Sequence, residues 1–170
     1  MITGKVTSVY GADINTDDII PAMHLQQSTE RPFFAEHAFS KFDEEFRERC
    51  RQTESNIIVA GENFGCGSSR EQAVYALSHN NVACVIAKSF PDIFHRNCLT
   101  NGLTLIVLED TSAFDLGHDL TVDLEKGVIE NHSTGERISF EMNDHVREIF
   151  MQGGMVGRVR QHLEEILSAG

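Results

Sequence analysis

The chain has 170 residues and carries 26 aspartate or glutamate residues against 14 lysine or arginine residues, which gives a formal net charge of −12 at pH 7. This length predicts one domain over residues 1–170 and is too short for two ordinary ones. The negative charge argues against nucleic acid or an anionic membrane surface as a partner. The sequence has no apolar run long enough to span a membrane and no signal-peptide core at its N-terminus, so we expect a cytoplasmic protein.

The four cysteines stand far apart, with no C-x-x-C pair among Cys50, Cys66, Cys84 and Cys98. This spacing predicts reduced structural thiols rather than a zinc site, an iron–sulfur cluster or a redox dithiol. Cys66 lies in a glycine-rich segment, where a nearby helix N-terminus would lower its thiol pKa. No histidine stands near it in the sequence, and the eight histidines form no ligand pair. We therefore expect neither a nucleophilic cysteine nor a metal site in this chain.

In chain order, residues 2–9 predict an opening strand, and residues 15–18 (NTDD) predict a polar turn that ends before Pro21. Asp17 and Asp18 leave two interpretations open. They could orient a base, bind a cation or meet a partner's charge, or they could be ordinary turn formers that bond to the backbone. Residues 24–31 are polar and predict a loop.

Residues 33–49 place phenylalanines at 34, 42 and 46, and an alanine at 38, at four-residue spacing among charges. This spacing predicts one amphipathic helix whose aromatic stripe belongs to the core. We expect that helix to be structural rather than part of a site.

Residues 57–77 (IIVAGENFGCGSSREQAVYAL) predict a buried strand, a glycine-rich loop and the start of a helix. Ser68 or Ser69 is a predicted N-cap, with Glu71 in the first turn. Free N–H groups at a helix N-terminus attract anions, and the planar fork of Arg70 suits a carboxylate. The loop fits neither phosphate-binding fingerprint, because no lysine precedes the serines and the glycines lack the G-x-G-x-x-G spacing. The alternative is a glycine loop and capped helix with no chemistry.

Further strands are predicted at 82–87 and 103–108, with a helix at 90–101 between them. Alternating strands and helices are typical of a parallel α/β sheet. From residue 120 the pattern changes to a three-strand antiparallel meander, followed by a helix capped by Asn143 and a final helix at 156–167. The predicted fold class is α/β, with a mostly parallel core sheet, additional antiparallel strands and flanking helices.

Three segments carry a family resemblance: NTDDIIP (15–21), GENFGCGSSRE (61–71) and SFPDIFHRNCLTNGL (89–103). Their order and spacing, the chain length and the closing TGERISF meander resemble the small subunit of isopropylmalate isomerase (3-isopropylmalate dehydratase), in the aconitase superfamily. The resemblance covers nearly the whole chain, and the GCGSSRE loop is its most specific part. It implies a single swivelling β/β/α domain that closes over a large subunit.

This resemblance implies a hydro-lyase that interconverts 2-isopropylmalate and 3-isopropylmalate by dehydration and rehydration in leucine biosynthesis. The enzyme would be active only with its large subunit, in a heterodimer or heterotetramer. In that family the large subunit holds a [4Fe–4S] cluster whose free iron binds the dicarboxylate substrate, so this chain alone would bind no cofactor.

Carried over by position, Ser68 resembles the base that removes a proton next to a carboxylate, and Ser69 and Arg70 resemble carboxylate binders. Asp17 resembles the residue that supports the acid–base machinery at the subunit junction. One departure from the family pattern is Gln72, which stands where relatives usually have histidine.

The resemblance also implies a specificity loop after Pro21, here occupied by His24, Leu25, Gln26 and Gln27. Gln26 carries no charge, which favours a substrate with an uncharged side group. Arg31 is near enough in the sequence to supply a positive charge instead. The alternatives are the same chemistry on homoaconitate, citraconate (citramalate) or dimethylmaleate (dimethylmalate), or a non-catalytic module that binds dicarboxylates.

Overall fold

A computed structural model describes residues 1–168, which form a seven-stranded sheet in the order β4-β3-β2-β1-β5-β6-β7. Strands β1 to β4 run parallel to their neighbours, and β5 to β7 continue antiparallel from β1. The strands are β1 (Ile2–Val9), β2 (Asn56–Ala60), β3 (Val82–Ala87), β4 (Thr104–Val107), β5 (Asp119–Asp123), β6 (Val128–Asn131) and β7 (Arg137–Ser139). The predicted α/β class, with its parallel core and antiparallel meander, is confirmed.

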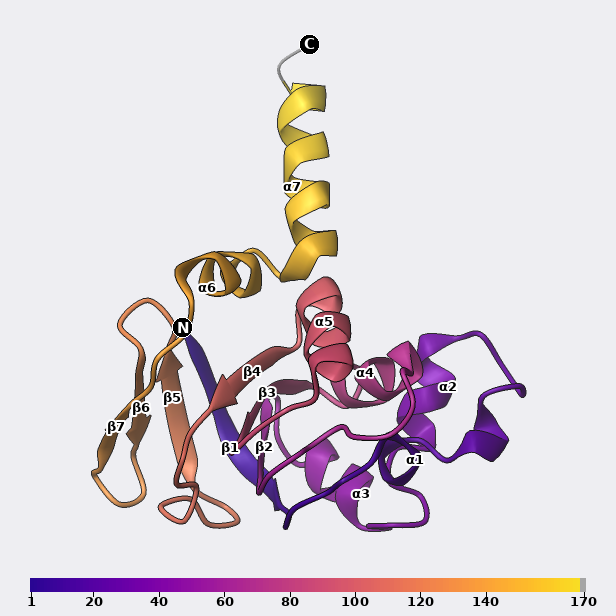
Figure 1. Ribbon diagram of the computed structural model, residues 1–170, viewed down its shortest axis with the longest axis horizontal. Helices are drawn as coiled ribbons and strands as arrows, with labels where there is room; N and C mark the ends of the chain where they lie inside the picture. Colours follow the sequence, from indigo (N-terminus) through magenta and orange to yellow (C-terminus); the bar gives the residue numbers. More distant parts are fainter. Residues whose placement is uncertain (169–170) are drawn as a thin grey trace.

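Figure 1 shows the meander β5–β7 at one end of the molecule, helices α1–α4 at the other, and the parallel strands between them. The helices are α1 (Thr16–Ile19), the 3₁₀ turn η1 (Ala22–His24), α2 (Arg31–Glu36), α3 (Phe46–Arg51), α4 (Glu71–Ser78), α5 (Asp92–Asn101), α6 (Asp144–Met151) and α7 (Gly154–Ser168). Asn143 caps α6 as predicted, by accepting hydrogen bonds from the N–H groups of His145 and Val146. Within residues 1–168, no helix combines the length and the apolar character that a bilayer span requires.

The parallel strands form the centre of the core, and every residue of β2 is buried. An unbroken apolar strand of this kind is expected when both faces of a sheet are covered. The loops after β1, β2 and β3 contain the three segments with the family resemblance. Because the carboxyl ends of adjacent parallel strands meet at one edge of a sheet, the topology brings these segments together.

The single amphipathic helix predicted for residues 33–49 is wrong. Two short helices, α2 and α3, are separated by turns in which Phe39 takes a positive φ of 52°. The N–H of Phe39 donates to the carbonyl of Ile19, 2.8 Å away, which folds the chain back. Phe39 and Phe46 still reach the core, with ring centroids 4.6 Å apart, whereas Phe42 is 46% exposed. Of the predicted stripe, Phe34, Ala38 and Phe46 are therefore buried, whereas Phe42 is replaced in the core by Phe39.

A fully buried amide, that of Asn56, joins the start of β2 to the two helices beside it. Its Nδ2 donates to the carbonyls of Cys50 (3.1 Å) and Asn80 (2.8 Å), and its Oδ1 accepts from the Thr53 hydroxyl. Burying such a group is favourable only while its partners are satisfied.

We expect Asn56→Leu to lower the free energy of unfolding by about 2–4 kcal/mol, because the buried Cys50 carbonyl and the partly buried Asn80 carbonyl lose their donor. Urea unfolding would measure the change. Asn101→Leu is the matched control, since within residues 1–168 that amide bonds only to the Asn97 carbonyl of its own helix, and we expect it to cost less than about 1 kcal/mol. Equal losses in the two variants would contradict the role given to Asn56.

A half-buried ion pair, Arg49 with Asp43, attaches α3 to the end of β1. Arg49 Nε donates to the Thr7 carbonyl at 2.7 Å, and the Tyr10 hydroxyl donates to Asp43 at 2.8 Å. Burial favours the neutral form of Asp43, but the hydrogen bonds from Arg49 and Tyr10 outweigh it and lower the pKa of this carboxyl. Asp43 is therefore a carboxylate at neutral pH.

A depressed pKa in the folded state stabilises the protein above the unfolded-state pKa of about 4, and this contribution is lost as the pH falls through the folded-state value. We therefore expect Asp43→Asn to be destabilised at neutral pH, and its difference from the unsubstituted chain to shrink below about pH 4. Urea unfolding as a function of pH tests this. Asp144→Asn, which removes a 94% exposed carboxylate, is the control. Its free energy of unfolding should equal that of the unsubstituted chain at each pH. A constant difference for Asp43→Asn across the pH range would refute the account.

Candidate active site

The loop after β1 and the loop after β2 are hydrogen-bonded to each other along their length. The N–H of Gly65 donates to the Ile14 carbonyl at 2.7 Å, and the N–H of Thr16 donates to the Cys66 carbonyl at 2.8 Å. These bonds form a short parallel bridge that continues the pairing of β1 with β2. The NTDD segment and the glycine loop are thus one unit.

The loop after β3 closes the other side of the glycine loop. The Ser89 hydroxyl and carbonyl accept from the N–H groups of Asn63 (2.8 Å) and Phe64 (3.1 Å). Gly65 has φ +84°, and a Cβ at this position would overlap the buried ring of Phe94 on α5. Glycine is therefore required there by both backbone conformation and space.

The predicted polar turn at residues 15–18 is a capped helix start instead. The Asn15 side chain accepts from the N–H groups of Asp17 (2.7 Å) and Asp18 (2.9 Å), and Asp18 Oδ2 accepts from the Asn15 N–H at 2.9 Å. This reciprocal pattern is a capping box at the start of α1. The Asp18 carboxylate therefore bonds to the backbone of its own helix start, and the Asp17 carboxylate is available to another partner.

That partner is Arg70, which lies 53 residues further along the chain. Asp17 Oδ1 accepts from Arg70 Nη1 at 3.0 Å and from the Ala22 N–H at 2.8 Å, and the same Nη1 donates to the Ile20 carbonyl at 3.3 Å. The hydrogen bond from Arg70, followed by that from Ala22, lowers the pKa of Asp17. An ionised Asp17 thus holds one nitrogen of the guanidinium. Within residues 1–168, Nε and Nη2 of Arg70 have no hydrogen-bond partner.

Neither Ser68 nor Ser69 caps α4, so that prediction is wrong. The helix begins at Glu71, and the residue at its N-cap is Arg70, which is extended (φ −126°, ψ 106°) and makes no side-chain cap. The Ser68 carbonyl accepts from the Thr16 hydroxyl at 3.1 Å, which fixes the loop at this point. Both serines are exposed, and within residues 1–168 their hydroxyls have no hydrogen-bond partner. The hydroxyls and the uncapped helix start are therefore accessible to a ligand.

The predicted specificity loop begins at the site itself, because the Ala22 N–H is bonded to Asp17. Of its four residues, Leu25 packs against the core, His24 bonds to Gln27 (3.2 Å), and Gln26 is exposed. The far end of the loop is attached to α4, where the Arg31 guanidinium lies 4.3 Å from the centroid of the Tyr75 ring. Both ends of the loop are thus connected to the helix that follows Arg70.

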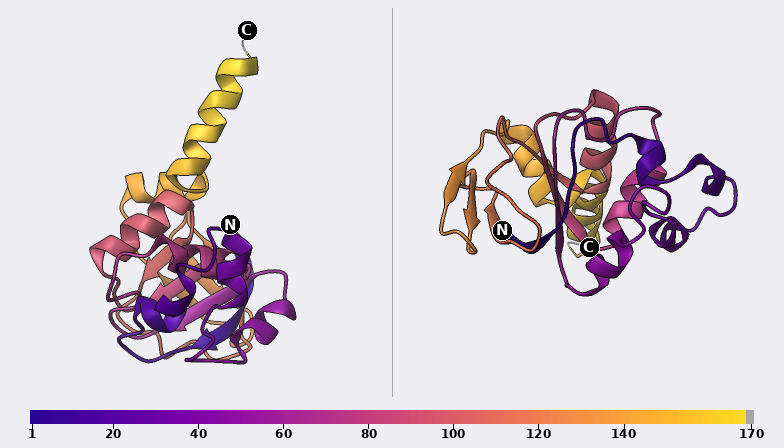
Figure 2. Two further views of the ribbon diagram at one scale, coloured as in Figure 1. Left: turned by 90° about the vertical axis from the view of Figure 1, so that its right-hand side faces the viewer. Right: turned by 90° about the horizontal axis from the view of Figure 1, so that it is seen from below.

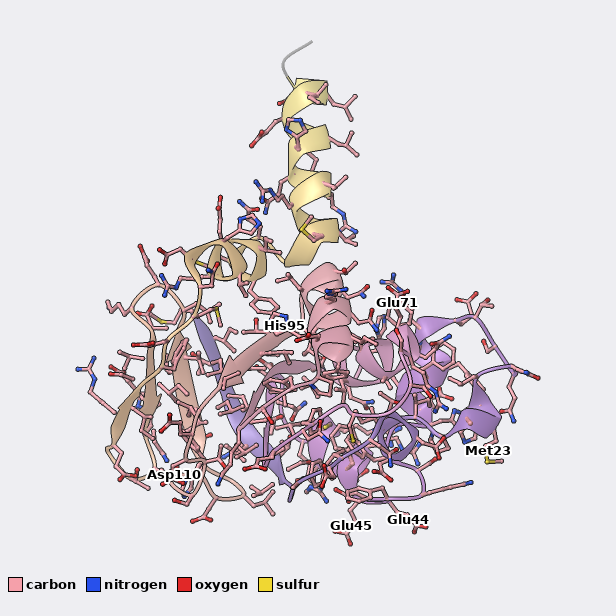
Figure 3. All side chains as sticks on the ribbon, in the orientation of Figure 1. Met23, Glu44, Glu45, Glu71, His95 and Asp110 are labelled. Carbon is pink, nitrogen blue, oxygen red and sulfur yellow. The ribbon has the colours of Figure 1, made fainter. Side chains whose placement is uncertain are left out.

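Two residues near the site were not predicted. Thr16 fixes the Ser68 carbonyl, and the N-x-x-D spacing of residues 15–18 would have indicated a capped helix with Thr16 at its first position. Met23 is 56% exposed, and Figure 3 shows it at the outer edge of the loop. No sequence pattern distinguishes an exposed methionine in a polar loop from a buried one.

The cysteine thiols make no hydrogen bond to the site residues within residues 1–168, and Cys66 contributes through its backbone carbonyl alone. Cys50, Cys84 and Cys98 are buried free thiols, and burial raises the pKa of Cys66, which Asp13 raises further. The expected lowering by a helix N-terminus is therefore wrong. Among residues 1–168, no three histidine, cysteine, aspartate or glutamate side chains gather as metal ligands. The side chains of these described residues do not offer the ligand set of an iron–sulfur cluster.

Comparison with known proteins agrees with the family resemblance. The family described as the aconitase C-terminal domain matches residues 3–111. The 3-isopropylmalate dehydratase small subunit of Methanosarcina mazei is 40% identical over 157 residues, which are 92% of this chain and 95% of that protein. The chain belongs to the 3-isopropylmalate dehydratase small-subunit family. Small subunit 1 of Methanopyrus kandleri is 41% identical over 156 residues, covering 90% of this chain and 89% of that protein.

The fold also matches that of a solved member of the small-subunit family. A crystal structure of 3-isopropylmalate dehydratase (leuD) from Methanocaldococcus jannaschii superposes with a TM-score of 0.86 at 37% identity, covering 99% of both chains. The expectation of family and fold drawn from the three segments is confirmed. The roles of Ser68, Ser69, Arg70, Asp17 and the specificity loop remain predictions.

Proposed function

We propose that this chain is the small subunit of a cytoplasmic hydro-lyase that interconverts 2-isopropylmalate and 3-isopropylmalate in leucine biosynthesis. Residues 1–170 act as one swivelling domain in this proposal. The observation that carries it is the juxtaposition of two exposed serine hydroxyls with the Asp17–Arg70 pair, in a chain of this family.

Arg70 is proposed to bind a substrate carboxylate. Asp17 and the Ile20 carbonyl hold Nη1, which orients the guanidinium plane and leaves the edge formed by Nε and Nη2 for a bidentate grip. Ser69 adds a hydroxyl donor beside it. A carboxylate held in this way fixes the adjacent carbon, from which a proton is removed.

Ser68, ionised to its alkoxide, is proposed to accept that proton and so become a neutral hydroxyl. A serine hydroxyl is a poor base in water, so the step requires positive potential at its oxygen and the exclusion of solvent. The uncapped start of α4 and Arg70 supply part of that potential. Ser68 is exposed in this chain, so solvent exclusion must come from a second surface. This requirement supports a role for Ser68 at a junction between two subunits.

A large subunit is the proposed source of that surface, and we assign the [4Fe–4S] cluster to it, in a heterodimer or heterotetramer. When bound there, the cluster would supply a Lewis acid for the departing hydroxyl. The three buried thiols of this chain, at positions 50, 84 and 98, are consistent with the cluster belonging elsewhere.

The loop after Pro21 is proposed to select the substrate side group. Gln26 and Gln27 are exposed and uncharged, and Met23 presents apolar surface at the edge of the loop. An isopropyl group is compatible with this lining, whereas an additional carboxylate would lack a partner, because Arg31 lies on the Tyr75 ring. Gln72, in the first turn of α4, takes the position of the usual family histidine.

The experiment that tests the substrate is a comparison of kcat/KM for hydration of isopropylmaleate, citraconate, dimethylmaleate and homoaconitate by the reconstituted two-subunit enzyme. We expect isopropylmaleate to be preferred by about tenfold or more, since one or two methyl groups in an apolar pocket give discrimination of this order. A preference for homoaconitate would reject the proposal for the loop, and binding of all four acids without turnover would favour a non-catalytic module.

A further inference from the structure

The loop after Pro21, residues 22–29, has few backbone contacts with the rest of the protein. Figures 1 and 2 show it projecting at the end of the molecule that holds α1–α4. Within residues 1–168, the Ala22 N–H is the one backbone group of this loop that bonds to another helix or strand, through Asp17. Its other backbone hydrogen bonds are local, such as that from the Gln27 N–H to the His24 carbonyl at 3.3 Å. Side-chain contacts must therefore hold this loop in its conformation.

One such contact is a stack of three aromatic rings from the loop and α2. The ring centroid of His24, at the end of η1, lies 4.0 Å from that of His37, which lies 4.3 Å from that of Phe33. Aromatic rings at these separations attract each other. His37 Nδ1 donates to the Phe33 carbonyl at 2.8 Å, which fixes the orientation of the His37 ring. His37 therefore holds the last residue of η1, whose first residue is bonded to Asp17.

A second contact holds the far end of the loop against α4. The Arg31 guanidinium lies 4.3 Å from the centroid of the Tyr75 ring, a distance at which a cation and a ring attract each other. The Tyr75 hydroxyl donates to Glu71 Oε2 at 3.2 Å, which fixes this ring along the first turns of α4. Glu71 directly follows Arg70 in the chain. Tyr75 thus connects the end of the loop to the helix start beside the proposed substrate-binding residue.

We propose that His37 and Tyr75 are positioning residues for substrate selection, because they hold the two ends of the loop. Each acts through another residue, His37 through His24 and Tyr75 through Arg31. A loop held at both ends presents one shape to the side group of the substrate. A loose loop adapts to several side groups and must be ordered when substrate binds, so selectivity and affinity both fall. This inference rests on the proposed function, in which the loop contacts that side group.

The first test is the selectivity of the reconstituted enzyme, measured as the ratio of kcat/KM for isopropylmaleate to kcat/KM for citraconate. We expect His37→Leu and Tyr75→Leu each to lower this ratio about threefold to tenfold. The loss should come from a higher KM for isopropylmaleate, with kcat changed by less than about twofold, because neither side chain takes part in the chemistry. His37→Phe and Tyr75→Phe retain a ring and should keep the ratio within about twofold of the unsubstituted value.

The second test uses the full chain alone and requires no activity. Hydrogen exchange followed by mass spectrometry reports opening of the loop backbone. Peptides covering residues 22–29 should exchange about threefold to tenfold faster in the two leucine variants, and at the unsubstituted rate in the two phenylalanine variants. Exchange in β2 should be unchanged in all four, which shows that the core is intact. His145→Leu, which removes an exposed imidazole from α6, is the matched control and should change neither measurement.

The two tests separate this inference from the proposed function. A preference of the unsubstituted enzyme for another acid rejects the function, whereas faster loop exchange in the leucine variants still supports the positioning of the loop by these two residues. Loop exchange at the unsubstituted rate in either leucine variant overturns the role given to that residue. Faster exchange with an unchanged selectivity ratio overturns the link to substrate selection. Equal effects of leucine and phenylalanine also overturn the inference, because the rings would then make no contribution.

Discussion

Ser68→Ala is expected to lower kcat of the reconstituted enzyme by about 10³-fold, with a change in KM of less than about threefold. The hydroxyl is exposed and makes no hydrogen bond within residues 1–168, so its removal leaves the loop in place. The loop is instead held through the Ser68 carbonyl, which accepts from Thr16. The loss therefore reports chemistry rather than folding.

The assay is hydration of isopropylmaleate at saturating substrate, with thermal unfolding of the isolated chain as the check on folding. Ser139→Ala, which removes an exposed hydroxyl from β7, is the matched control and should retain full activity. A Ser68→Ala enzyme that keeps its kcat would exclude Ser68 as the base.

Arg70→Lys is expected to lower kcat/KM by about 10²-fold to 10³-fold, because an ammonium cannot hold a carboxylate in a bidentate grip or fix the adjacent carbon. Both KM and kcat should change. The variant retains a positive charge near Asp17, which separates the loss of geometry from the loss of charge. Steady-state kinetics of the reconstituted enzyme measure the effect.

The matched control for Arg70→Lys is Arg137→Lys, which alters an exposed ion pair with Glu130 on the meander and should leave kcat/KM unchanged. Asp17→Asn should produce a smaller loss than Arg70→Lys, and the double variant should lose less than the sum, because Asp17 acts through the orientation of Arg70. Fully additive losses would contradict that coupling.

The sheet and the edge that holds the site were predictable from the sequence. Residues 82–87 and 57–60 are continuous apolar runs, and strands of this kind are buried in parallel sheets. Once β1, β2 and β3 are parallel neighbours, the loops after them must meet. Pairing of the NTDD and GCGSSR segments therefore follows from the topology. The contact between Asp17 and Arg70 does not follow from it and is seen only in the coordinates.

The incorrect predictions arose where distant contacts decide local structure. Residues 33–49 have helical periodicity, but the Phe39 N–H bonds to Ile19, and the chain turns instead of continuing as a helix. Ser68 has the composition of an N-cap, but its carbonyl is held by Thr16, so the helix starts later, at Glu71. Neither partner lies within reach of a local sequence pattern.

The final helix illustrates a different limit. Its amphipathic pattern predicted the element correctly, as α7 at residues 154–168, but that pattern is equally typical of a helix packed on its own domain. Only the coordinates show that α7 extends away from the body (Figure 2) and that its large apolar residues are exposed.

The central claim is that this chain contributes one half of an active site that is complete only with a large subunit. The most direct measurement is the rate of isopropylmaleate hydration as this chain is titrated into a fixed amount of cluster-loaded large subunit. The account predicts no turnover by either subunit alone and a rate that rises and saturates at a fixed subunit ratio. Turnover by one subunit alone, or an assembled complex that does not turn over, would contradict it.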